Sequence, residues 1–420
     1  RAISSNPFIF TTPNVTVLIL RHFLPHFIQE NYRNGIHAGH LNAFTMFVDL
    51  SGFTRLTETL MQKGSEGAEE LSVALNHIFQ PMVRLVYDQG GFIPYFAGDS
   101  FTAIFPVPQS SALHPETLVI ARRVIQTAQL TLSRFALQQE DEDSMLLEHN
   151  IGIKIGLSEG TVEWGIVGKN RKAYYFRGEP IDGCSQAQVR ASSLEVVGDT
   201  LFRPYLLPLG LEAEELEDGY LKITLPAAQP QQSKKMMPEG PVRQLPVPDP
   251  LIMAEFLPKE VFENQGIGEF RNVVSVFLSF TGVDTHTALD HFASVVLQEC
   301  DNFGAYLKEI DFGDKGGVIF CLFGAPISFE NNVERALEFV AAILDEMVSL
   351  ENLTGARYRI GITSGLAFTG VIGSAERCQY AAAGARVNLG ARLMMKAKWG
   401  EVMADENVQR NRNFKFTYKG

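Results

Sequence analysis

Cysteine is scarce in this chain, and the few cysteines present form no recognisable motif. The four residues are Cys184, Cys300, Cys321 and Cys378. They show neither a CxxC pair nor the spacing of zinc ligands, so they give no indication of a zinc site. We interpret them as small core residues of a protein in the reducing cytoplasm.

Positive charge and long apolar runs are also in short supply. The chain has 36 lysines and arginines against 48 aspartates and glutamates, a formal net charge of -12 at pH 7. Because lysine and arginine supply most of the affinity for phosphate backbones, we expect no nucleic-acid partner. The apolar stretch of residues 15–20 is short and runs into Arg21, so we expect no transmembrane segment.

What the chain does contain is two copies of one pattern. Its 420 residues, 45% of them hydrophobic, suit two domains of ordinary size with a connector. The apolar run of residues 43–50 recurs at 273–280, and the hairpin pattern of residues 90–108 recurs at 306–326. Four pairs of glycines keep a spacing of 205 or 206 residues: Gly156 with Gly361, Gly160 with Gly365, Gly168 with Gly373, and Gly178 with Gly384. Such collinearity is not expected by chance.

Composition changes between the two copies. Proline, glutamine and lysine displace the apolar periodicity over residues 226–250, and proline favours an extended backbone. We therefore expect an N-terminal segment, residues 1–40, that packs on the core, and a first domain, residues 41–225. A proline-rich linker, residues 226–265, and a second domain, residues 266–420, would follow.

The pattern within each copy predicts the fold class. Each copy follows the order strand, helix, helix, hairpin, helix, strand, hairpin, helix, which is typical of an α+β fold with helices on one face of an antiparallel-rich sheet. Amphipathic helices are predicted at residues 68–87, 115–138 and 332–350, where apolar residues recur at helical spacing. Two similar halves in one chain favour a pseudo-two-fold pair with the functional site between them.

Two aspartates of the first copy stand at the ends of predicted strands. Asp49 ends a very apolar strand, and Asp99 occupies the bend of a hairpin after Ala97 and Gly98. A buried carboxylate in such a place needs a cation or hydrogen-bond donors. Two carboxylates on neighbouring strands can hold a pair of hard divalent ions with oxygen ligands. Alternatively, each aspartate could merely cap a turn.

The segment after Asp49 is a candidate anion site. Ser51, Gly52, Phe53 and Thr54 open a predicted helix. Glycine lets backbone amides approach a ligand, and a helix N-terminus favours negative charge. A serine or threonine before a helix is usually only a cap, but beside an aspartate the segment predicts a triphosphate cradle.

The second copy carries different polar residues. Ser279 stands where the first copy has Asp49, while Asn388 and Arg392 are four residues apart and share one face of a predicted helix. Arginine suits a phosphoryl oxygen and asparagine can fix a sugar, although both could belong to an exposed polar face. The first copy has Gln186 in place of the arginine. Each copy thus carries a different part of the candidate functional residues, which predicts one working site per chain.

These motifs resemble those of class III nucleotide cyclases. FVDLSGFT, residues 47–54, with FAGDSF, residues 96–101, is similar to their metal-binding half, and GARVNLGARLM, residues 384–394, to the half with the transition-state residues. The tandem order and LKEIDFGDKG, residues 307–316, resemble the soluble adenylyl cyclase subgroup. The resemblance implies two ferredoxin-like class III cyclase domains that form an intramolecular pseudo-two-fold heterodimer.

The resemblance also implies an activity and its residues. The chain would be an adenylate cyclase that converts ATP to 3′,5′-cyclic AMP and pyrophosphate, using two Mg²⁺ ions that Mn²⁺ can replace. Asn388 would orient the ribose, and Arg392 would stabilise charge that develops on the α-phosphate. The metal ligands would be Asp49, the Leu50 carbonyl and Asp99. The substrate-binding residues would be Ser51, Gly52, Phe53, Thr54, Lys308, Ala382 and Lys419.

Base recognition departs from the family pattern. Lys308 would be the lysine that recognises adenine, in a segment whose alignment with the family pattern slips by one residue before Asp314. Lys419 would contact the β- and γ-phosphates. The run from Ala381 to Ala383 replaces the usual threonine or aspartate, and alanine side chains cannot hydrogen-bond to a base. A weak or inactive pseudocyclase that senses nucleotide, and a guanylate cyclase, are therefore alternatives. The expected binding partner is ATP. The two cyclase domains are expected to pair within the chain, and regulatory domains are expected beyond residue 420.

Regulation by bicarbonate is a property of soluble adenylyl cyclases. The resemblance places the anion in the pseudo-symmetric second pocket, where a lysine and an arginine hold it. This chain has Tyr95 and Ser185 at those positions, and neither side chain carries the charge that would offset the desolvation of a buried anion. We therefore expect weak or no stimulation, unless Arg177 or Arg190 reaches the pocket.

Overall fold

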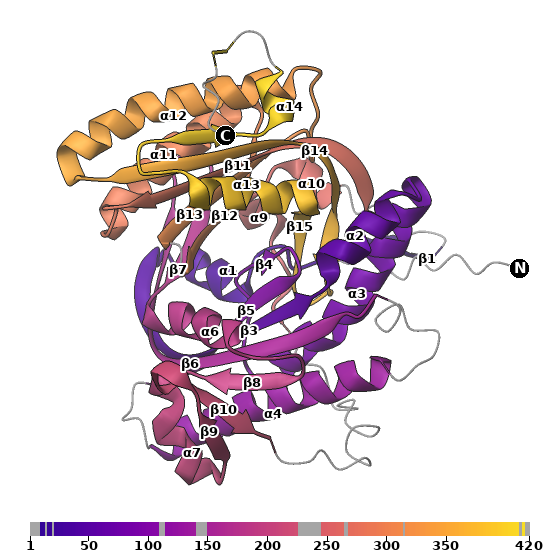
Figure 1. Cartoon of the computed structure of the whole chain (residues 1–420), viewed down its shortest axis with the longest axis vertical. Helices are drawn as coiled ribbons and strands as arrows, with labels where there is room; N and C mark the ends of the chain where they lie inside the picture. Colours follow the sequence, from indigo (N-terminus) through magenta and orange to yellow (C-terminus); the bar gives the residue numbers. More distant parts are fainter. Residues whose placement is uncertain are drawn as a thin grey trace, which may run out of the picture.

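Two β-sheets, one from each copy of the repeated pattern, form the body of the molecule (Figure 1). The computed structural model describes residues 9–12, 15–18, 21–108, 114–139, 149–225, 245–263, 268–313, 316–410 and 414–415. Within these ranges, no helix combines the length and the apolarity that a bilayer span requires. A separate hairpin near the N-terminus consists of β1 (Ile9–Thr12) and β2 (Val15–Leu18).

The first sheet is largely antiparallel. Its eight strands are β3 (Ala38–Ser51), β4 (Phe96–Ala97), β5 (Ser100–Val107), β6 (Gly152–Val167), β7 (Ala173–Arg177), β8 (Glu195–Gly198), β9 (Glu212–Glu215) and β10 (Leu221–Thr224). They follow the order β4-β5-β3-β6-β8-β10-β9, and β7 also pairs with β6. The strands β6 and β8 run parallel.

The second sheet repeats the centre of the first. Its six strands are β11 (Glu269–Thr281), β12 (Tyr306–Gly313), β13 (Gly316–Phe323), β14 (Arg357–Gly373), β15 (Cys378–Ala383) and β16 (Val402–Ala404). The order is β12-β13-β11-β14-β15, and β16 pairs in parallel with β14. In both sheets the first long strand therefore lies between a hairpin strand and a second long strand, as expected for a duplicated unit.

The helices include the three predicted amphipathic segments, but the second copy has one helix between its first strand and its hairpin, within the described residues 268–313, where two were predicted. They are α1 (His26–Arg33), α2 (Phe53–Met61), α3 (Ser65–Asp88), α4 (Pro115–Gln139), α6 (Glu179–Val189), α7 (Arg203–Leu209), α9 (Pro250–Phe256), α10 (Lys259–Glu263), α11 (His286–Phe303), α12 (Asn332–Thr354), α13 (Ala385–Lys396) and α14 (Glu406–Gln409). The described ranges also contain two short 3₁₀ turns, η1 (Thr200–Phe202) and η2 (Glu217–Gly219). The helices expected at residues 68–87, 115–138 and 332–350 are confirmed as α3, α4 and α12.

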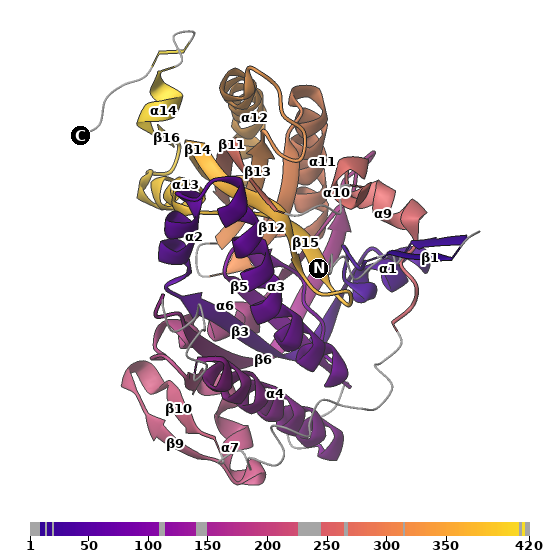
Figure 2. The ribbon, with the colours of Figure 1, turned by 90° about the vertical axis from the view of Figure 1, so that its right-hand side faces the viewer.

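Helices cover both faces of the second sheet, so the expectation of a single covered face is wrong. In β14, Ile360 and Ile362 are buried in an apolar cluster that includes residues of α11 and α12. Gly361 between them faces the other way, and a Cβ there would collide with α13. Gly156 of β6 stands in the same relation to α6. Figure 2 shows α11 and α12 on one side of the second sheet and α13 on the other.

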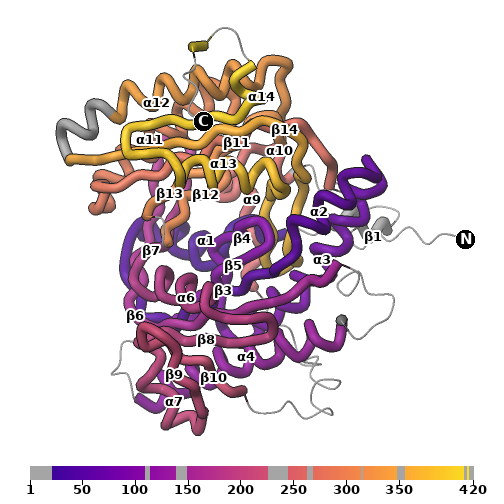
Figure 3. Tube along the Cα trace, viewed as in Figure 1, coloured from indigo at the N-terminus to yellow at the C-terminus, as the bar shows by residue number. Residues whose placement is uncertain are grey.

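The two halves meet through several elements. β7 packs against β12, and α2 packs against α13 (Figure 3). The backbone of His22 exchanges hydrogen bonds with Ala375 (3.2 Å) and Cys378 (2.9 Å) of the second half. The fully buried Arg377 donates to the carbonyls of Phe23 (2.7 Å) and Ile93 (2.9 Å). The segment before β3 thus lies against both halves.

Part of the range expected to be an extended linker is helical. Residues 226–244 lie outside the described ranges, but α9 and α10 fall within residues 245–263. The side chain of Asp249 accepts a hydrogen bond from the N–H of Leu251 (3.0 Å) and caps α9, and Pro250 occupies the first turn. Proline there starts a helix instead of preventing one.

Candidate active site

Asp49 and Asp99 lie next to each other at one end of the first sheet. Asp49 pairs with Ser100 in the ladder between β3 and β5. Asp99 and Gly98 form the two-residue turn between β4 and β5, and Gly98 has a φ of +69°, which this tight turn requires at its first position. The N–H of Leu50 donates to the carbonyl of Asp99 (3.1 Å), which ties the turn to the end of β3.

The two carboxyl groups are partly buried, and this environment opposes their ionisation. Burial and the charge of Asp49 raise the pKa of Asp99 to about 7. Burial also raises the pKa of Asp49, although Lys154 and a hydrogen bond from Gln188 Nε2 to Asp49 Oδ2 (2.8 Å) act in the opposite direction. A divalent ion between the two carboxylates would offset their mutual repulsion, and Mg²⁺ and Mn²⁺ prefer such oxygen ligands, so the residues fit these ions. In the described part of the chain, no third acidic, histidine or cysteine side chain completes a metal-binding group.

The segment from Ser51 to Thr54 forms the turn into α2. Gly52 precedes the helix with a φ of +85°, and a Cβ there would lie 3.0 Å from the Asn150 carbonyl, so both conformation and space require glycine. Phe53, predicted to bind substrate, has its side chain buried in the core. It can therefore offer a ligand only its backbone N–H at the start of α2.

Asn388 joins the two halves at this turn. Its Nδ2 donates to Thr54 Oγ1 (3.1 Å), which links α13 of the second half to α2 of the first. Arg392 lies one turn further along α13, and its side chain is exposed. The structure thus brings Asn388, one of the two predicted catalytic residues, to the segment predicted to bind triphosphate, and it leaves the other, Arg392, exposed to solvent.

Lys308 occupies an irregularity of β12. The register with β13 shifts between Leu307 and Glu309, which leaves Lys308 as an extra residue, and this explains the slip in the sequence pattern. Its Nζ is buried, donates to the Phe96 carbonyl (2.8 Å) and pairs with Glu309 Oε2 (2.6 Å). Glu309 is therefore a polar group of the site that the sequence analysis missed.

A cavity of about 260 Å³ lies between the halves, and Asp49 and Asp99 adjoin it without being among the residues that line it. Gly98, the neighbour of Asp99 in the hairpin turn, lines it from the first half. Lys308, Ala382 and Asn388 line it from the second half. Lys419 lies outside the described residues. The cavity therefore joins the carboxylate hairpin to the residues predicted to bind base and sugar.

The equivalent position of the second half has different chemistry. Ser279 lies opposite Arg359 in the sheet, as Asp49 lies opposite Lys154. Arg359 donates through Nε to Ser279 Oγ (3.5 Å) and through Nη1 to the carbonyl of Met395 (3.1 Å). A serine beside a guanidinium offers no anionic ligand to a divalent ion.

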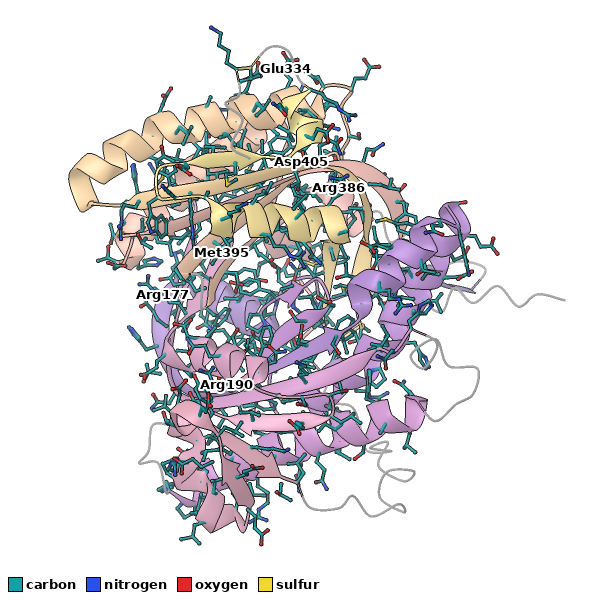
Figure 4. The ribbon with its side chains drawn as sticks, in the orientation of Figure 1. Arg177, Arg190, Glu334, Arg386, Met395 and Asp405 are labelled. Atoms are coloured by element: carbon teal, nitrogen blue, oxygen red, sulfur yellow. The ribbon has the colours of Figure 1, made fainter. Side chains whose placement is uncertain are left out.

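The residues considered for an anion pocket do not converge. The Tyr95 hydroxyl donates to a backbone carbonyl of β7 (2.9 Å), and Ser185 lines the 260 Å³ cavity, which does not include Tyr95. Arg177, at the boundary between the halves (Figure 4), pairs with Glu163 (2.7 Å). Arg190 pairs with an aspartate of the first half. Each arginine therefore has an anionic partner already.

The paired sheets and the interfacial cavity beside two carboxylates define a class III nucleotide cyclase fold. The family model described as the adenylate and guanylate cyclase catalytic domain matches residues 37–198 and 308–420. The chain belongs to this family, and the predicted α+β pair of cyclase domains is confirmed.

Known proteins resemble the chain over most of its length. Adenylate cyclase type 10 of Oryctolagus cuniculus is 27% identical over 396 residues, which are 83% of this chain and 23% of that protein. The Homo sapiens protein of the same name is 26% identical over 425 residues, 90% of this chain and 25% of that protein. The chain thus spans about a quarter of these relatives. A solved class III adenylyl cyclase-like ATP-binding protein from Pseudomonas aeruginosa, 13% identical, shares the fold with a TM-score of 0.60 over 88% of this chain and 85% of that one.

Proposed function

We propose that this chain is an adenylate cyclase that converts ATP to 3′,5′-cyclic AMP and pyrophosphate in the cavity between its halves. The observation that carries the proposal is the adjacency of Asp49 and Asp99 at the hairpin whose residues Gly98 and Ser100 line one wall of the cavity, while Asn388 lines the other. The similarity to adenylate cyclase type 10 supports ATP as the substrate.

Asp49, Asp99 and the Leu50 carbonyl would hold two divalent ions, Mg²⁺ or Mn²⁺. Such ions, when bound, supply Lewis-acid activation of the ribose 3′-hydroxyl and neutralise charge on the pyrophosphate leaving group. The two aspartates would thereby set the position of the α-phosphate relative to the attacking hydroxyl. The proposal explains why two carboxylates are kept together in a site that raises the pKa of each.

The remaining polar residues would hold the substrate. The amides at the start of α2, from Gly52 to Thr54, would bind triphosphate oxygens, and Lys419 would meet the terminal phosphates. Asn388 would exchange its hydrogen bond with Thr54 for one to the ribose. Arg392 would turn from solvent towards the α-phosphate, where its charge stabilises the transition state.

The base would lie near Lys308, Glu309 and Ala382, which line the same cavity. Lys308 can donate to a ring nitrogen of adenine, and Glu309 can accept from its amino group. The Glu309 carboxylate could equally accept from the N–H groups of guanine, and this observation favours guanylate cyclase as the second candidate.

The test is a cyclase assay on the purified chain with ATP and GTP in separate reactions, each with Mg²⁺ or Mn²⁺. We expect cyclic AMP from ATP, no product in excess EDTA, and less cyclic GMP from GTP. Faster formation of cyclic GMP would establish the second candidate. Absence of both products, with binding of an ATP analogue retained, would reduce the chain to a nucleotide sensor.

A further inference from the structure

We propose that Gln188 is a positioning residue for the carboxylate pair. Its amide holds one oxygen of Asp49 and leaves the other oxygen for a divalent ion. The inference rests on the proposed metal-binding role of Asp49, and it adds to that role a residue of α6 that touches neither substrate nor reacting atoms.

The position of Gln188 is fixed by backbone packing. The residue lies in the last turn of α6, only 7% of it is exposed, and its Nε2 donates to Asp49 Oδ2 over 2.8 Å. A Cβ added to Gly156 of β6 would collide with the backbone N and the Cβ of Gln188. The glycine therefore lets α6 lie directly on the sheet, one strand away from Asp49.

The second half supplies an internal comparison. A Cβ on Gly361 would collide with the backbone N and Cα of Met394, as one on Gly156 would with Gln188. Met394 is thus the structural counterpart of Gln188, and Ser279 is the counterpart of Asp49. The amide is absent in the half that lacks the carboxylate. A buried methionine satisfies the packing of this position, so packing alone does not require glutamine.

The amide also limits a competing contact. Lys154 lies directly opposite Asp49 in the ladder between β3 and β6, and its charge acts on the carboxylate. With Gln188 in place, one oxygen of Asp49 is held by a neutral donor. Without it, the carboxylate is free to rotate towards the lysine, which would compete with a metal ion. Partners that orient a ligand in this way typically contribute 10- to 100-fold in metal affinity.

The experiment compares Gln188→Met, which copies the second half, with the matched control Met394→Gln. Binding of Mn²⁺ to the nucleotide-free protein is measured by electron paramagnetic resonance of the free ion, alongside a thermal melt. We expect Gln188→Met to weaken Mn²⁺ binding by about 10- to 100-fold at a melting temperature close to that of the wild type. Met394→Gln should leave Mn²⁺ binding unchanged.

Gln188→Leu serves as a second variant if the methionine substitution does not fold. Wild-type Mn²⁺ binding in a folded Gln188 variant would overturn the inference, and so would an equal loss in Met394→Gln. The binding readout separates this inference from the proposed function. If the wild-type protein binds Mn²⁺ through Asp49 but forms no cyclic nucleotide, the proposed function is refuted. The Mn²⁺ titrations of the Gln188 and Met394 variants still test the role of Gln188 in that case.

Discussion

In both halves of the molecule, a glycine of a long strand lets a helix pack directly on the sheet, on the side of the interface. The first half places Asp49 and Gln188 beside that contact, whereas the second half has Ser279 and Met394 there. The contact between backbones is kept because any side chain would separate helix and sheet. The difference in polar residues fits the proposed single site between the halves, which would need its carboxylates only once.

The largest expected effect is the loss of either carboxylate. Asp49→Ala and Asp99→Asn should each lower cyclase turnover on the order of a thousandfold or more, because each removes a charge proposed to hold the metal ions. Ser279→Ala, the change at the equivalent place, should leave turnover within about twofold. The check is initial-rate kinetics beside a thermal melt. Near-normal turnover in a folded Asp49 or Asp99 variant would break the comparison.

A second contrast concerns the helices α13 and α6. Arg392→Ala should lower kcat on the order of a hundredfold with a small change in KM, because the arginine acts on charge that develops in the transition state. Gln186→Ala, at the equivalent place, should have little effect, since Gln186 accepts a hydrogen bond from Tyr220 (2.9 Å) within the first half. Equal losses in both variants would indicate two working sites.

The third contrast is in stability. Burial and Asp49 raise the pKa of Asp99 to about 7, so ionisation of Asp99 opposes folding increasingly from about pH 4 to about pH 7. Asp99→Asn should therefore raise the melting temperature of the metal-free protein at pH 8, and the corresponding gain in unfolding free energy should be at most about 4 kcal/mol. The gain should shrink towards pH 4. Ser279→Ala carries no charge change and should show no such pH dependence; a lower melting temperature for Asp99→Asn at pH 8 would contradict the account.

The smallest expected effect is that of bicarbonate. Tyr95 and Ser185 line different cavities, and Arg177 is paired with Glu163. None of these three residues therefore offers an unpaired positive charge to a small anion. Turnover at constant pH should be the same in bicarbonate and in chloride of matched ionic strength. A saturable, several-fold rise would show that the anion binds through other residues.

The sequence predicted the duplicated fold and the carboxylate pair because both leave local signals. Apolar runs mark the strands, and Gly98 marks the turn that carries Asp99. The cap of α9 also has a local signal, Asp249 before Pro250, which the proline content of the region obscured.

The other features depend on contacts between distant segments. Lys308 is an extra residue only with respect to its pairing with β13, and Glu309 enters the cavity through the same shift. Gln188 reaches Asp49 because α6 packs on a glycine of β6. Aligning the two copies places glutamine at residue 188 opposite methionine at residue 394. This difference indicates a role for Gln188 only once the packing shows that its amide reaches Asp49. Arg392 lies on the predicted helix, yet its exposure follows from how the halves meet.

The central claim, one metal site in one of two similar halves, is tested most directly by anomalous diffraction at the manganese edge. The crystals would contain the chain with Mn²⁺ and a non-hydrolysable ATP analogue. The account predicts manganese peaks between Asp49 and Asp99 and none beside Ser279. Peaks beside Ser279, or an analogue bound with no manganese near Asp49 and Asp99, would contradict it.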